Sequence, residues 1–338
     1  IFLAGKQEKD GVHGTAIIKH FDTIKPKYKI SEKYKNSWVL MDRDTHADDN
    51  AEHLYRHIKL NYPEVKIFYA LRSSSHDWER LIQEEFNLLE FGSEEHRSAL
   101  ESCSKVISSH ADYCVTNFLG PKMLSDRHFV FLQHGVIKDD LSGWLNQKEN
   151  IDCFVTASKP EFDSIISNNS PYKFGKKEVV LTGLPRHDKL LKSSINNNKK
   201  ILIMPTWRSS IVGEPNKSGS ERELNPLFME SCYAEHWYSL LHSAELYRIS
   251  LKYGYEVIFY PHLNILPYLD KFNIPEFIQL GNKNNRGIQD IFNDASLLVT
   301  DYSSVAFDMA VQSKPTIYYQ FDEDTVFQGS HTYAKGYY

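Results

Sequence analysis

Short apolar runs alternate along the chain with longer amphipathic segments. From Trp38 onward, six runs rich in β-branched and aromatic residues predict strands over Trp38–Met41, Val65–Leu71, Lys105–Ser108, Phe129–Gln133, Cys153–Thr156 and Glu178–Thr182. The segments between them predict helices, for example over Asp48–Leu60, Asp77–Phe86 and Glu94–Cys103. Such alternation is typical of a parallel sheet whose strands are joined by crossover helices.

The same alternation restarts at Lys200. It predicts strands over Ile201–Met204, Glu256–Tyr260, Phe277–Leu280, Ser296–Thr300 and Pro315–Gln320, and helices over Tyr233–Tyr253 and Ser304–Gln312. The polar segment 193–199 is the expected linker, and residues 209–232 are expected to form a long loop. The pattern thus predicts a lead-in or linker over residues 1–35 and two α/β domains, residues 36–192 and 199–338, with a cleft between them. The C-terminus is expected to be truncated.

Composition narrows the class of protein. The 338 residues fit two domains of roughly 100–200 residues each. A net charge of −5 argues against bulk nucleic-acid binding, which usually needs a basic domain. The four cysteines form no CxxC pair, so neither a zinc site nor a disulfide framework is indicated. No apolar run approaches the roughly 20 residues of a membrane span. We expect a cytoplasmic protein, and a peripheral position at the plasma membrane stays open.

Four strand ends carry unusual polar residues. Gln133-His134-Gly135 follows a strand of the first half, and Pro205–Arg208, Tyr260-Pro261-His262 and Asp301–Ser304 follow strands of the second. In open parallel sheets, ligands bind beyond the carboxyl ends of the strands. Because all four strand ends face the same predicted cleft, we expect the chemistry of the protein to be found there.

The Asp301-Tyr302-Ser303-Ser304 stretch lies where a strand gives way to a helix. The N–H groups and dipole of a helix N-terminus favour a phosphate, and two hydroxyls add donors. Asp308, on the first turns of the same helix, could accept hydrogen bonds from ribose hydroxyls, and Asp301 would orient the turn. The alternative is simple helix capping, for which Ser and Asp are preferred residues.

Arg208, Thr206, His134 and His262 complete the set of candidates. The planar guanidinium of Arg208 would fit a diphosphate. The alternatives are a surface arginine and structural or solvated histidines. Convergence at one cleft favours a nucleotide-diphosphate donor held by the second half and an acceptor presented by the first.

Together the stretches LQHGVIKDD, PTWR, YPH and TDYSSVAFD…KPTIYY resemble the CDP-glycerol glycerophosphotransferase family, which polymerises teichoic acids and related capsule polymers. WVLMDRDTHADDNAEHLYRHI resembles the amino-terminal Rossmann half of that family, and FQGSHTYAKGYY resembles its C-terminal segment, cut short. The resemblance covers about residues 36–338, and TDYSSVAFD is its most specific part. One departure is Gln133, where the family often has tryptophan.

The resemblance implies two Rossmann-like domains in the glycosyltransferase B arrangement. It implies transfer of a polyol phosphate from CDP-glycerol or CDP-ribitol to the hydroxyl of a growing cell-wall or capsule polymer, with release of CMP and without a cofactor. The essential histidines of the family correspond to His134 and His262, and its diphosphate contacts to Arg208 and the Ser303-Ser304 helix start.

The expected mechanism is metal-independent. The acceptor hydroxyl attacks the β-phosphorus of the donor, His134 acts as general base, and His262 and Arg208 stabilise the developing charge. Thr206, Asp301 and Asp308 are expected to complete the donor site. Two alternatives stay open: a nucleotide-sugar-dependent glycosyltransferase or epimerase of the same architecture, and a non-catalytic module of a larger polymerase.

Several short motifs favour other sites only weakly. Asp42-Arg43-Asp44 imitates a metal-binding DxD, yet a hard cation needs several convergent oxygens. The neighbouring Asp48-Asp49-Asn50 reads as a helix cap. His53 and His57 have zinc-like spacing, but a solvated helix face explains them better. The basic runs Lys25–Lys35 and Lys173–Lys177 are interpreted as solvated faces that could also meet anionic lipid or polymer.

Overall fold

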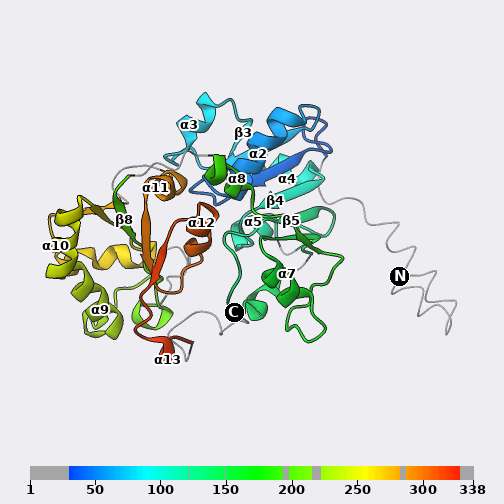
Figure 1. Ribbon diagram of the computed structural model, residues 1–338. Coiled ribbons are helices and arrows are strands. Elements are labelled where there is room, and N and C mark those ends of the chain that lie inside the picture. The colour runs from blue at the N-terminus through cyan, green and yellow to red at the C-terminus, as the bar shows by residue number, and fades with distance from the viewer. Residues whose placement is uncertain are drawn as a thin grey trace.

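The structure is a computed structural model that describes residues 30–120, 122–148, 150–192, 198–214, 222–281 and 287–327. It contains two parallel β-sheets flanked by helices, which confirms the α/β fold class (Figure 1). The strand order is β3-β2-β1-β4-β5-β6-β7 in the seven-stranded sheet and β10-β9-β8-β11-β12 in the five-stranded sheet. We call residues 30–192 the first half and residues 198–327 the second half.

The first half contains the seven-stranded sheet. Its strands are β1 (Trp38–Met41), β2 (Ile67–Leu71), β3 (Leu88–Glu90), β4 (Lys105–Ser108), β5 (His128–Phe131), β6 (Cys153–Thr156) and β7 (Val179–Leu181). Its helices are α2 (Asn50–Asn61), α3 (Trp78–Gln83), α4 (Glu94–Ser102), α5 (Tyr113–Thr116), α6 (Ser142–Leu145), α7 (Lys159–Ile166) and α8 (Pro185–Lys192).

The second half contains the five-stranded sheet. Its strands are β8 (Lys200–Ile203), β9 (Glu256–Phe259), β10 (Ile278–Leu280), β11 (Leu297–Thr300) and β12 (Thr316–Tyr318). Its α-helices are α9 (Cys232–Leu241), α10 (Ala244–Tyr253), α11 (Ile288–Asp294), α12 (Val305–Val311) and α13 (Glu323–Thr325). Three 3₁₀ segments are η2 (Ser209–Ile211), η3 (Phe228–Glu230) and η4 (Leu263–Phe272).

All the strands predicted from the sequence are present, with ends shifted by up to two residues. The sequence pattern missed β3, because three residues give too little periodicity. The predicted helix Tyr233–Tyr253 is two helices, since the side chain of Ser243 accepts a hydrogen bond from the N–H of Leu246 and starts α10. The predicted loop 209–232 contains η2, η3 and the fully buried Phe228, while residues 215–221 lie outside the described part.

Both segments expected to be linkers fall largely outside the described residues. Residues 1–29 of the predicted lead-in and residues 193–197 of the predicted linker are not described. Within the described remainder of the lead-in, Tyr34 is buried and its ring packs edge-on against Phe68, with the centroids 5.0 Å apart. This part of the chain therefore contributes to the core of the first half.

Each sheet has an apolar cluster on both faces. Consecutive residues of β1 show the alternation: Val39 packs with Phe129 on one face, and Leu40 packs with Tyr55 on the other. Strand β8 alternates in the same way between two clusters of the second half. Burial of both faces explains why these strands read as continuous apolar runs in the sequence.

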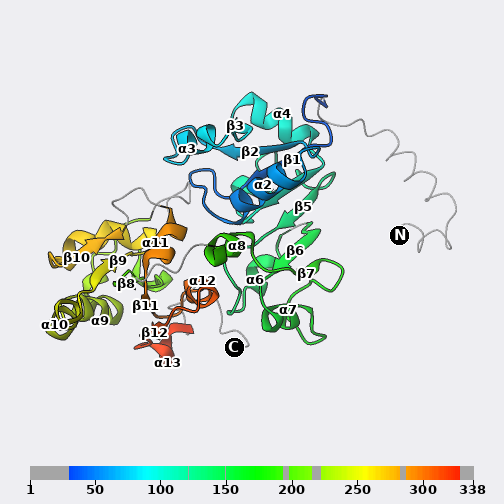
Figure 2. The same ribbon diagram turned by 45° about the horizontal axis from the view of Figure 1, so that its top comes forward.

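The strand order reverses once in each sheet, between β1 and β4 and between β8 and β11. At such a point the crossover helices leave on opposite faces, which opens a crevice at the carboxyl ends of the strands. Helix α8 lies between the two sheets and packs against α2, α11 and α12 (Figure 2). The last helix of the first half thus contacts helices of both halves.

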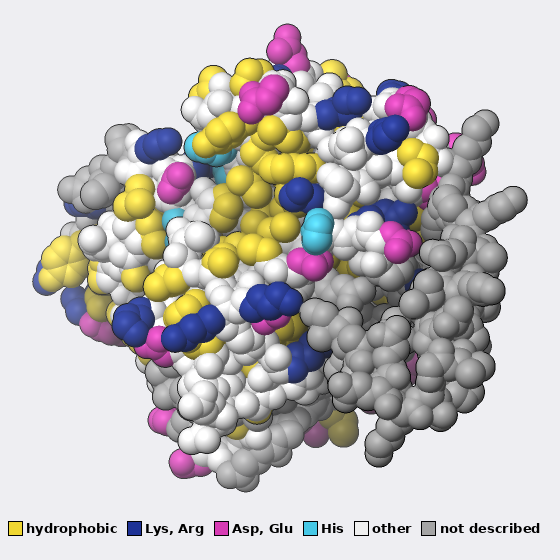
Figure 3. Space-filling view, turned by 90° about the vertical axis from the view of Figure 1, so that its right-hand side faces the viewer, with side chains coloured by type: hydrophobic (Ala, Val, Ile, Leu, Met, Phe, Trp, Pro, Cys, Tyr) yellow, Lys and Arg dark blue, Asp and Glu magenta, His cyan; other side chains and the backbone are white. Residues whose placement is uncertain are grey.

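A groove of about 1610 Å³, lined by both apolar and charged side chains, borders α2, α3, α8 and the strands β5–β7. Val130, Leu132, Cys153, Val155 and Val180 are among the residues that line it. Hydrophobic side chains also gather in a patch on the face of the molecule seen in Figure 3, with charged side chains around them. No described helix has both the length and the apolar character that crossing a bilayer requires.

Candidate active site

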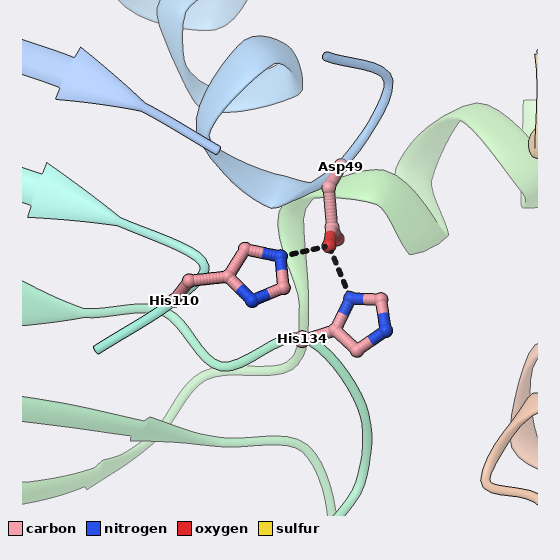
Figure 4. A group of neighbouring side chains, drawn as sticks. All are labelled: Asp49, His110 and His134. Carbon is pink, nitrogen blue, oxygen red and sulfur yellow. Dashed lines mark hydrogen bonds and ion pairs between the residues drawn. The ribbon is translucent and has the colours of Figure 1, made fainter. Parts of the chain in front are cut away.

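Asp49 and His134 form a hydrogen-bonded pair at the carboxyl edge of the first sheet. Asp49 is the N-cap residue of α2, and His134 follows β5. Nδ1 of His134 lies 2.6 Å from Oδ2 of Asp49 (Figure 4). Because a carboxylate can only accept, Nδ1 is the donor and Nε2 is left as the basic atom. The imidazole is 66% exposed, so Nε2 is accessible to a substrate.

The electrostatic surroundings keep Asp49 ionised. Burial alone would raise the pKa of Asp49, but the Arg186 guanidinium and His134 hold it well below its usual range. Oδ1 of Asp49 accepts a hydrogen bond from Nη1 of Arg186 at 2.8 Å. An ionised carboxylate at Nδ1 stabilises the imidazolium that forms when His134 takes up a proton.

A second histidine, His110, supports the pair from the end of β4. Its Nε2 lies 3.6 Å from Oδ2 of Asp49, and its ring centroid lies 4.7 Å from that of His134 (Figure 4). Burial lowers the pKa of His110 to about 4, so at neutral pH this ring is uncharged. His110 therefore packs against His134 without competing with it for a proton.

Side-chain hydrogen bonds of Gln133 fix the loop that carries His134. This residue has a φ of 65°, an uncommon conformation for a residue other than glycine. Its side-chain amide donates hydrogen bonds to the carbonyl of Val155 and to Oε1 of Glu161, the latter at 3.0 Å. The same Glu161 oxygen accepts from the N–H of Ile137 at 2.7 Å. Gln133, the departure from the family pattern, thus has a structural role in this chain.

Asp42 fixes the start of α2. Its buried carboxylate accepts hydrogen bonds from the N–H groups of Ala51 and Glu52 and from the hydroxyl of Tyr69, at 2.9, 3.1 and 2.8 Å. Burial, followed by the charge of Asp49, raises the pKa of Asp42 to about 7. The first acid of the DxD-like motif is therefore committed to the helix that carries Asp49.

In the second half, Asp301 joins the ends of β8 and β11. Its buried carboxylate accepts from the backbone N–H of Thr206 at 2.8 Å, from that of Tyr302 at 2.7 Å and from Nη2 of Arg208 at 2.8 Å. The Thr206 hydroxyl is buried and has no hydrogen-bond partner among the described residues. Asp301 therefore orients both strand ends through their backbone.

Arg208 does not face the cleft as expected. Its guanidinium is 1% exposed and bonds Asp301 and Asp322, the latter through Nε at 2.9 Å. It also lies over the rings of Tyr233 and Tyr302, 5.3 and 5.1 Å from their centroids. With its donors and its charge already satisfied, Arg208 holds the framework of the donor side together and is not placed to grip a diphosphate.

Asp308 is also occupied by another partner. Both its oxygens accept from Arg186, at 2.8 and 3.0 Å, and its side chain is 3% exposed. The expected contact between Asp308 and a ribose does not fit this geometry. The carboxylate links α12 of the second half to α8 of the first half.

Ser303 and Ser304 lie where expected, at the start of α12. Ser304 occupies the N-cap position, but its side chain makes no capping hydrogen bond, and Ser303 Oγ accepts weakly from the N–H of Val305 at 3.4 Å. Capping therefore does not account for the Ser304 hydroxyl. This serine also meets the first half: a β-carbon built on Gly135 would lie 2.4 Å from Ser304 Oγ.

His262 follows β9 in the second half, whereas His134 follows β5 in the first. Its exposed ring stacks on Trp207, with the centroids 5.6 Å apart, and its Nδ1 accepts from the N–H of Asn264 at 3.2 Å. Although the residue is accessible to solvent on one side, the surrounding protein desolvates its ring, and this effect, followed by the positive charges of Arg43 and His134, lowers the pKa of His262 to about 4. Both histidines are thus close enough to influence each other electrostatically, although they come from different sheets.

The sequence analysis missed Asp49, His110, Arg186 and Arg43. Asp49 was interpreted only as a helix cap, which it also is, since it accepts from the N–H of Asn50 at 2.8 Å. His110 follows β4, so inspection of every strand end would have found it, whereas Arg186 is the second residue of α8, five residues beyond the end of β7. The signal was the position at a strand end, and no short motif accompanies it.

Asp49 and His110, together with His134, also have metal-ligating atoms. The ligand atoms of Asp49, His110 and His134 lie within 4.8 Å of one another. However, Oδ1 of Asp49 is bonded to Arg186, and 2.6 Å between Oδ2 and Nδ1 of His134 is a hydrogen-bond distance. Hydrogen bonding therefore accounts for the arrangement of the three side chains.

Comparison with known proteins identifies the family. The family described as CDP-Glycerol:Poly(glycerophosphate) glycerophosphotransferase matches residues 25–335. The chain belongs to this family. It is 37% identical over 300 residues to the minor teichoic acid biosynthesis protein GgaB of Bacillus subtilis (strain 168), covering 87% of this chain and 33% of GgaB. It is 25% identical over 186 residues to the teichoic acid glycerol-phosphate transferase of Staphylococcus aureus (strain NCTC 8325 / PS 47), covering 51% of this chain and 42% of that protein.

The chain spans less than half the length of these two relatives. Among solved structures, the wall teichoic acid polymerase TagF soaked with CDPG matches with a TM-score of 0.59 at 15% identity, over 89% of this chain and 75% of that chain. The S. aureus MnaA–UDP structure matches with a TM-score of 0.54 at 12% identity, over 89% and 85% of the two chains. At these identities the likeness shows the fold.

The contact between Gly135 and Ser304 can be tested through stability. We expect Gly135→Ala to lower the free energy of unfolding by about 1–3 kcal/mol, because the new methyl group must displace Ser304. Adding Ser304→Gly should recover most of the loss. Gly143→Ala is the matched control, since nothing lies within 4 Å of its added β-carbon. Urea unfolding measures the three variants and the wild type; no recovery in the double variant would contradict the contact.

We expect the protein to be insensitive to metal removal. Hydrogen bonds satisfy Asp49 in the absence of an ion, so EDTA should leave the melting temperature unchanged. Added Mg²⁺ or Zn²⁺ should not raise it. A melting temperature that rises with Zn²⁺ in the wild type but not in His110→Ala would show that the three side chains do capture a metal.

Proposed function

We propose that the two halves are Rossmann-like domains in the glycosyltransferase B arrangement, with boundaries near residues 36–192 and 199–338. The reversal of strand order in each sheet and the contacts of α8 with both halves support this arrangement. The TM-scores of 0.59 and 0.54 to TagF and MnaA support it at the level of the fold. The reacting groups would meet in the crevice between the two sheets.

We further propose that the chain transfers a polyol phosphate from a CDP-activated donor, CDP-glycerol or CDP-ribitol, to a hydroxyl of a polymer. Family membership supports the reaction class. The observation that carries the mechanism is the hydrogen-bonded pair of Asp49 and the exposed His134, whose neighbour Gly135 lies against Ser304, a serine that makes no capping hydrogen bond. A base and a phosphate-binding helix start are the two parts that this reaction requires.

In the proposed step, the acceptor hydroxyl loses its proton to Nε2 of His134 and its oxygen attacks the β-phosphorus. The bond from this phosphorus to the bridging oxygen breaks, and CMP leaves. Ser303, Ser304 and the N–H groups of the turn would bind the phosphoryl oxygens. His262 would donate a hydrogen bond to the diphosphate, since its low pKa keeps it neutral and a neutral ring with an accepting Nδ1 carries its proton on Nε2.

A positive charge for the diphosphate is available from Arg43 in place of Arg208. Arg43 follows β1 at the crevice, its side chain is exposed, and no described carboxylate pairs with it. Its positive charge contributes to lowering the pKa of both His110 and His262. We propose that Arg43 contacts the phosphoryl groups of the donor or of an anionic acceptor. Lys173–Lys177 could bring the protein to anionic polymer or to the inner membrane surface.

The direct test is incubation of the protein with CDP-glycerol, CDP-ribitol and UDP-sugars in the presence of a glycerol-phosphate oligomer. We expect release of CMP from a CDP-polyol and no nucleoside diphosphate from the UDP-sugars. Release of UDP would favour the alternative, a nucleotide-sugar-dependent transferase of the same architecture. Absence of any product with every donor and acceptor pair would contradict transfer by this chain.

His134→Ala should reduce kcat for CMP release by about 10²–10⁴-fold, because the reaction loses its general base. His262→Ala should also reduce turnover strongly. His57→Ala is the control, since this histidine is on α2 and its ring nitrogen contacts only Asn61 among the described polar groups. Near-normal turnover by His134→Ala, with an unchanged melting temperature, would remove the proposed base.

The serines are tested through nucleotide binding. We expect Ser303→Ala with Ser304→Ala to weaken binding of CDP and CDP-polyol together, since both contain the diphosphate, and to weaken CMP binding less. Calorimetric titration of the double variant with CDP and with CMP gives the comparison. If CDP affinity is unchanged and the variant only melts earlier, the serines serve the helix and not the ligand.

A further inference from the structure

Arg186 makes an unusual number of contacts for a single side chain. Its Nε and Nη2 donate to the two oxygens of Asp308, and its Nη1 donates to Oδ1 of Asp49 at 2.8 Å and to the carbonyl of His134 at 2.6 Å. Its backbone N–H donates to Oδ1 of Asn50 at 3.1 Å. The residue therefore bonds to both members of the Asp49–His134 pair and to the second half at once.

These contacts are buried, so they restrain their partners strongly. The Arg186 side chain is 5% exposed, Asp308 is 3% and Asp49 is 12% exposed. Burial alone would lower the pKa of Arg186, but Asp308 and Asp49 raise it above its ordinary value. Removing one member of a buried ion pair leaves an uncompensated charge, which is strongly destabilising. The three charged groups consequently hold one another in a single arrangement.

The charges around Arg186 also bear on the proposed proton transfer. Asp49 and Asp308 contribute two negative charges, and Arg186 contributes one positive charge. Protonation of Nε2 of His134 would add a positive charge beside the carboxylate of Asp49. The other ring beside Asp308 is that of His187, whose Nε2 lies 3.4 Å from Oδ1. The cluster is thus arranged to stabilise the state in which His134 holds the proton of the acceptor.

Asp308 lies on α12, the helix that begins with the proposed phosphate-binding serines. At the start of this helix, Ser304 touches Gly135, the residue next to His134. The Arg186–Asp308 pair fixes the same helix about one turn further along. Two contacts therefore set the position of α12 relative to the loop of His134, one steric and one ionic.

We propose that Arg186 is a positioning residue that couples the donor-side helix α12 to the orientation of His134, so that the base is correctly placed only while Asp308 is bound. The inference rests on the proposed function for the identity of the reaction, and on the contacts above for the coupling. Separation of the two halves would break the Asp308 contacts and leave Asp49 and the His134 carbonyl with a loosely held partner. The active arrangement would then form only in the closed protein.

The sharpest test uses Asp308→Asn, which removes one charge and touches neither Asp49 nor His134. We expect kcat for CMP release to fall about 10–100-fold, the effect of a small misplacement of a reacting group, while KM for the CDP-polyol changes less than about threefold. Arg186→Lys keeps the positive charge but loses the paired N–H donors of the guanidinium. This variant should show the same changes in kcat and KM as Asp308→Asn. Lys192→Ala, an exposed change on the same helix α8, is the control and should match the wild type.

Comparing the activity losses of the single and double variants shows whether Arg186 and Asp308 act through one shared contact or affect the site separately. If the loss of kcat comes only from breaking the Arg186–Asp308 ion pair, the double variant Asp308→Asn, Arg186→Lys should lose no more activity than the less active of the two single variants. A kcat that falls only in proportion to the folded fraction, or two losses that simply add, would overturn the proposal. Thermal unfolding of each variant supplies the folded fraction at the assay temperature.

A measurement without substrate keeps this inference independent of the proposed reaction. The Nδ1–H of His134, bonded to Asp49, should give a downfield proton resonance, assigned by its loss in His134→Gln. We expect this resonance to shift or broaden in Asp308→Asn and to stay in place in Lys192→Ala. An unchanged resonance in Asp308→Asn would overturn the coupling even if CDP-polyol transfer is confirmed, and a changed one would support it even if that transfer fails.

Discussion

The guanidinium of Arg186, shared between carboxylates of the two halves, is the interaction on which the arrangement of the site depends. A buried arginine needs full pairing of its charge and donors, because desolvation of an unpaired ion costs several kcal/mol. Here the pairing requires Asp49 from the start of α2, Asp308 from α12 and the carbonyl of His134 after β5. These three elements therefore cannot shift independently. The requirement is met only when the two sheets are side by side.

The first half is prepared for this contact by other fixed groups. Asp42 anchors the first N–H groups of α2 and so places Asp49. Gln133 keeps a φ of 65°, a conformation that costs on the order of 1 kcal/mol or more, because Glu161 holds its side chain and Asn50 binds its carbonyl at 2.8 Å. Local strain at Gln133 is thus tolerated where it directs His134 out of the sheet. The imidazole of His134 is therefore exposed because the backbone around Gln133 is held rigidly, and not because the loop is loose.

The strand pattern predicted the fold class and nearly every strand, because both faces of each sheet are buried and leave continuous apolar runs. The position of polar residues after strands also drew attention to His134, His262 and the serines, which follow β5, β9 and β11 in the structure. What the pattern could not show is which polar groups satisfy one another. Arg208 pairs with Asp322, 114 positions away, and Asp308 pairs with Arg186, 122 positions away. Such partners are decided by tertiary packing, so two residues predicted to bind the donor are instead used to hold the framework.

This use of Arg208 changes how the donor side must work. With that guanidinium neutralised, the described strand ends of the second half offer hydroxyls, backbone N–H groups and an uncharged His262. Arg43, an exposed residue of the first half, adds a positive charge that acts on His262. Under the proposed function, a diphosphate would therefore need groups from both halves to balance its charge. Donor binding and closure of the crevice would then favour each other, since each brings Arg43 and the serines to the same anion. The Arg186–Asp308 contact stabilises that closed arrangement, so the groups that bind the donor and the group that removes the acceptor proton come together in one step.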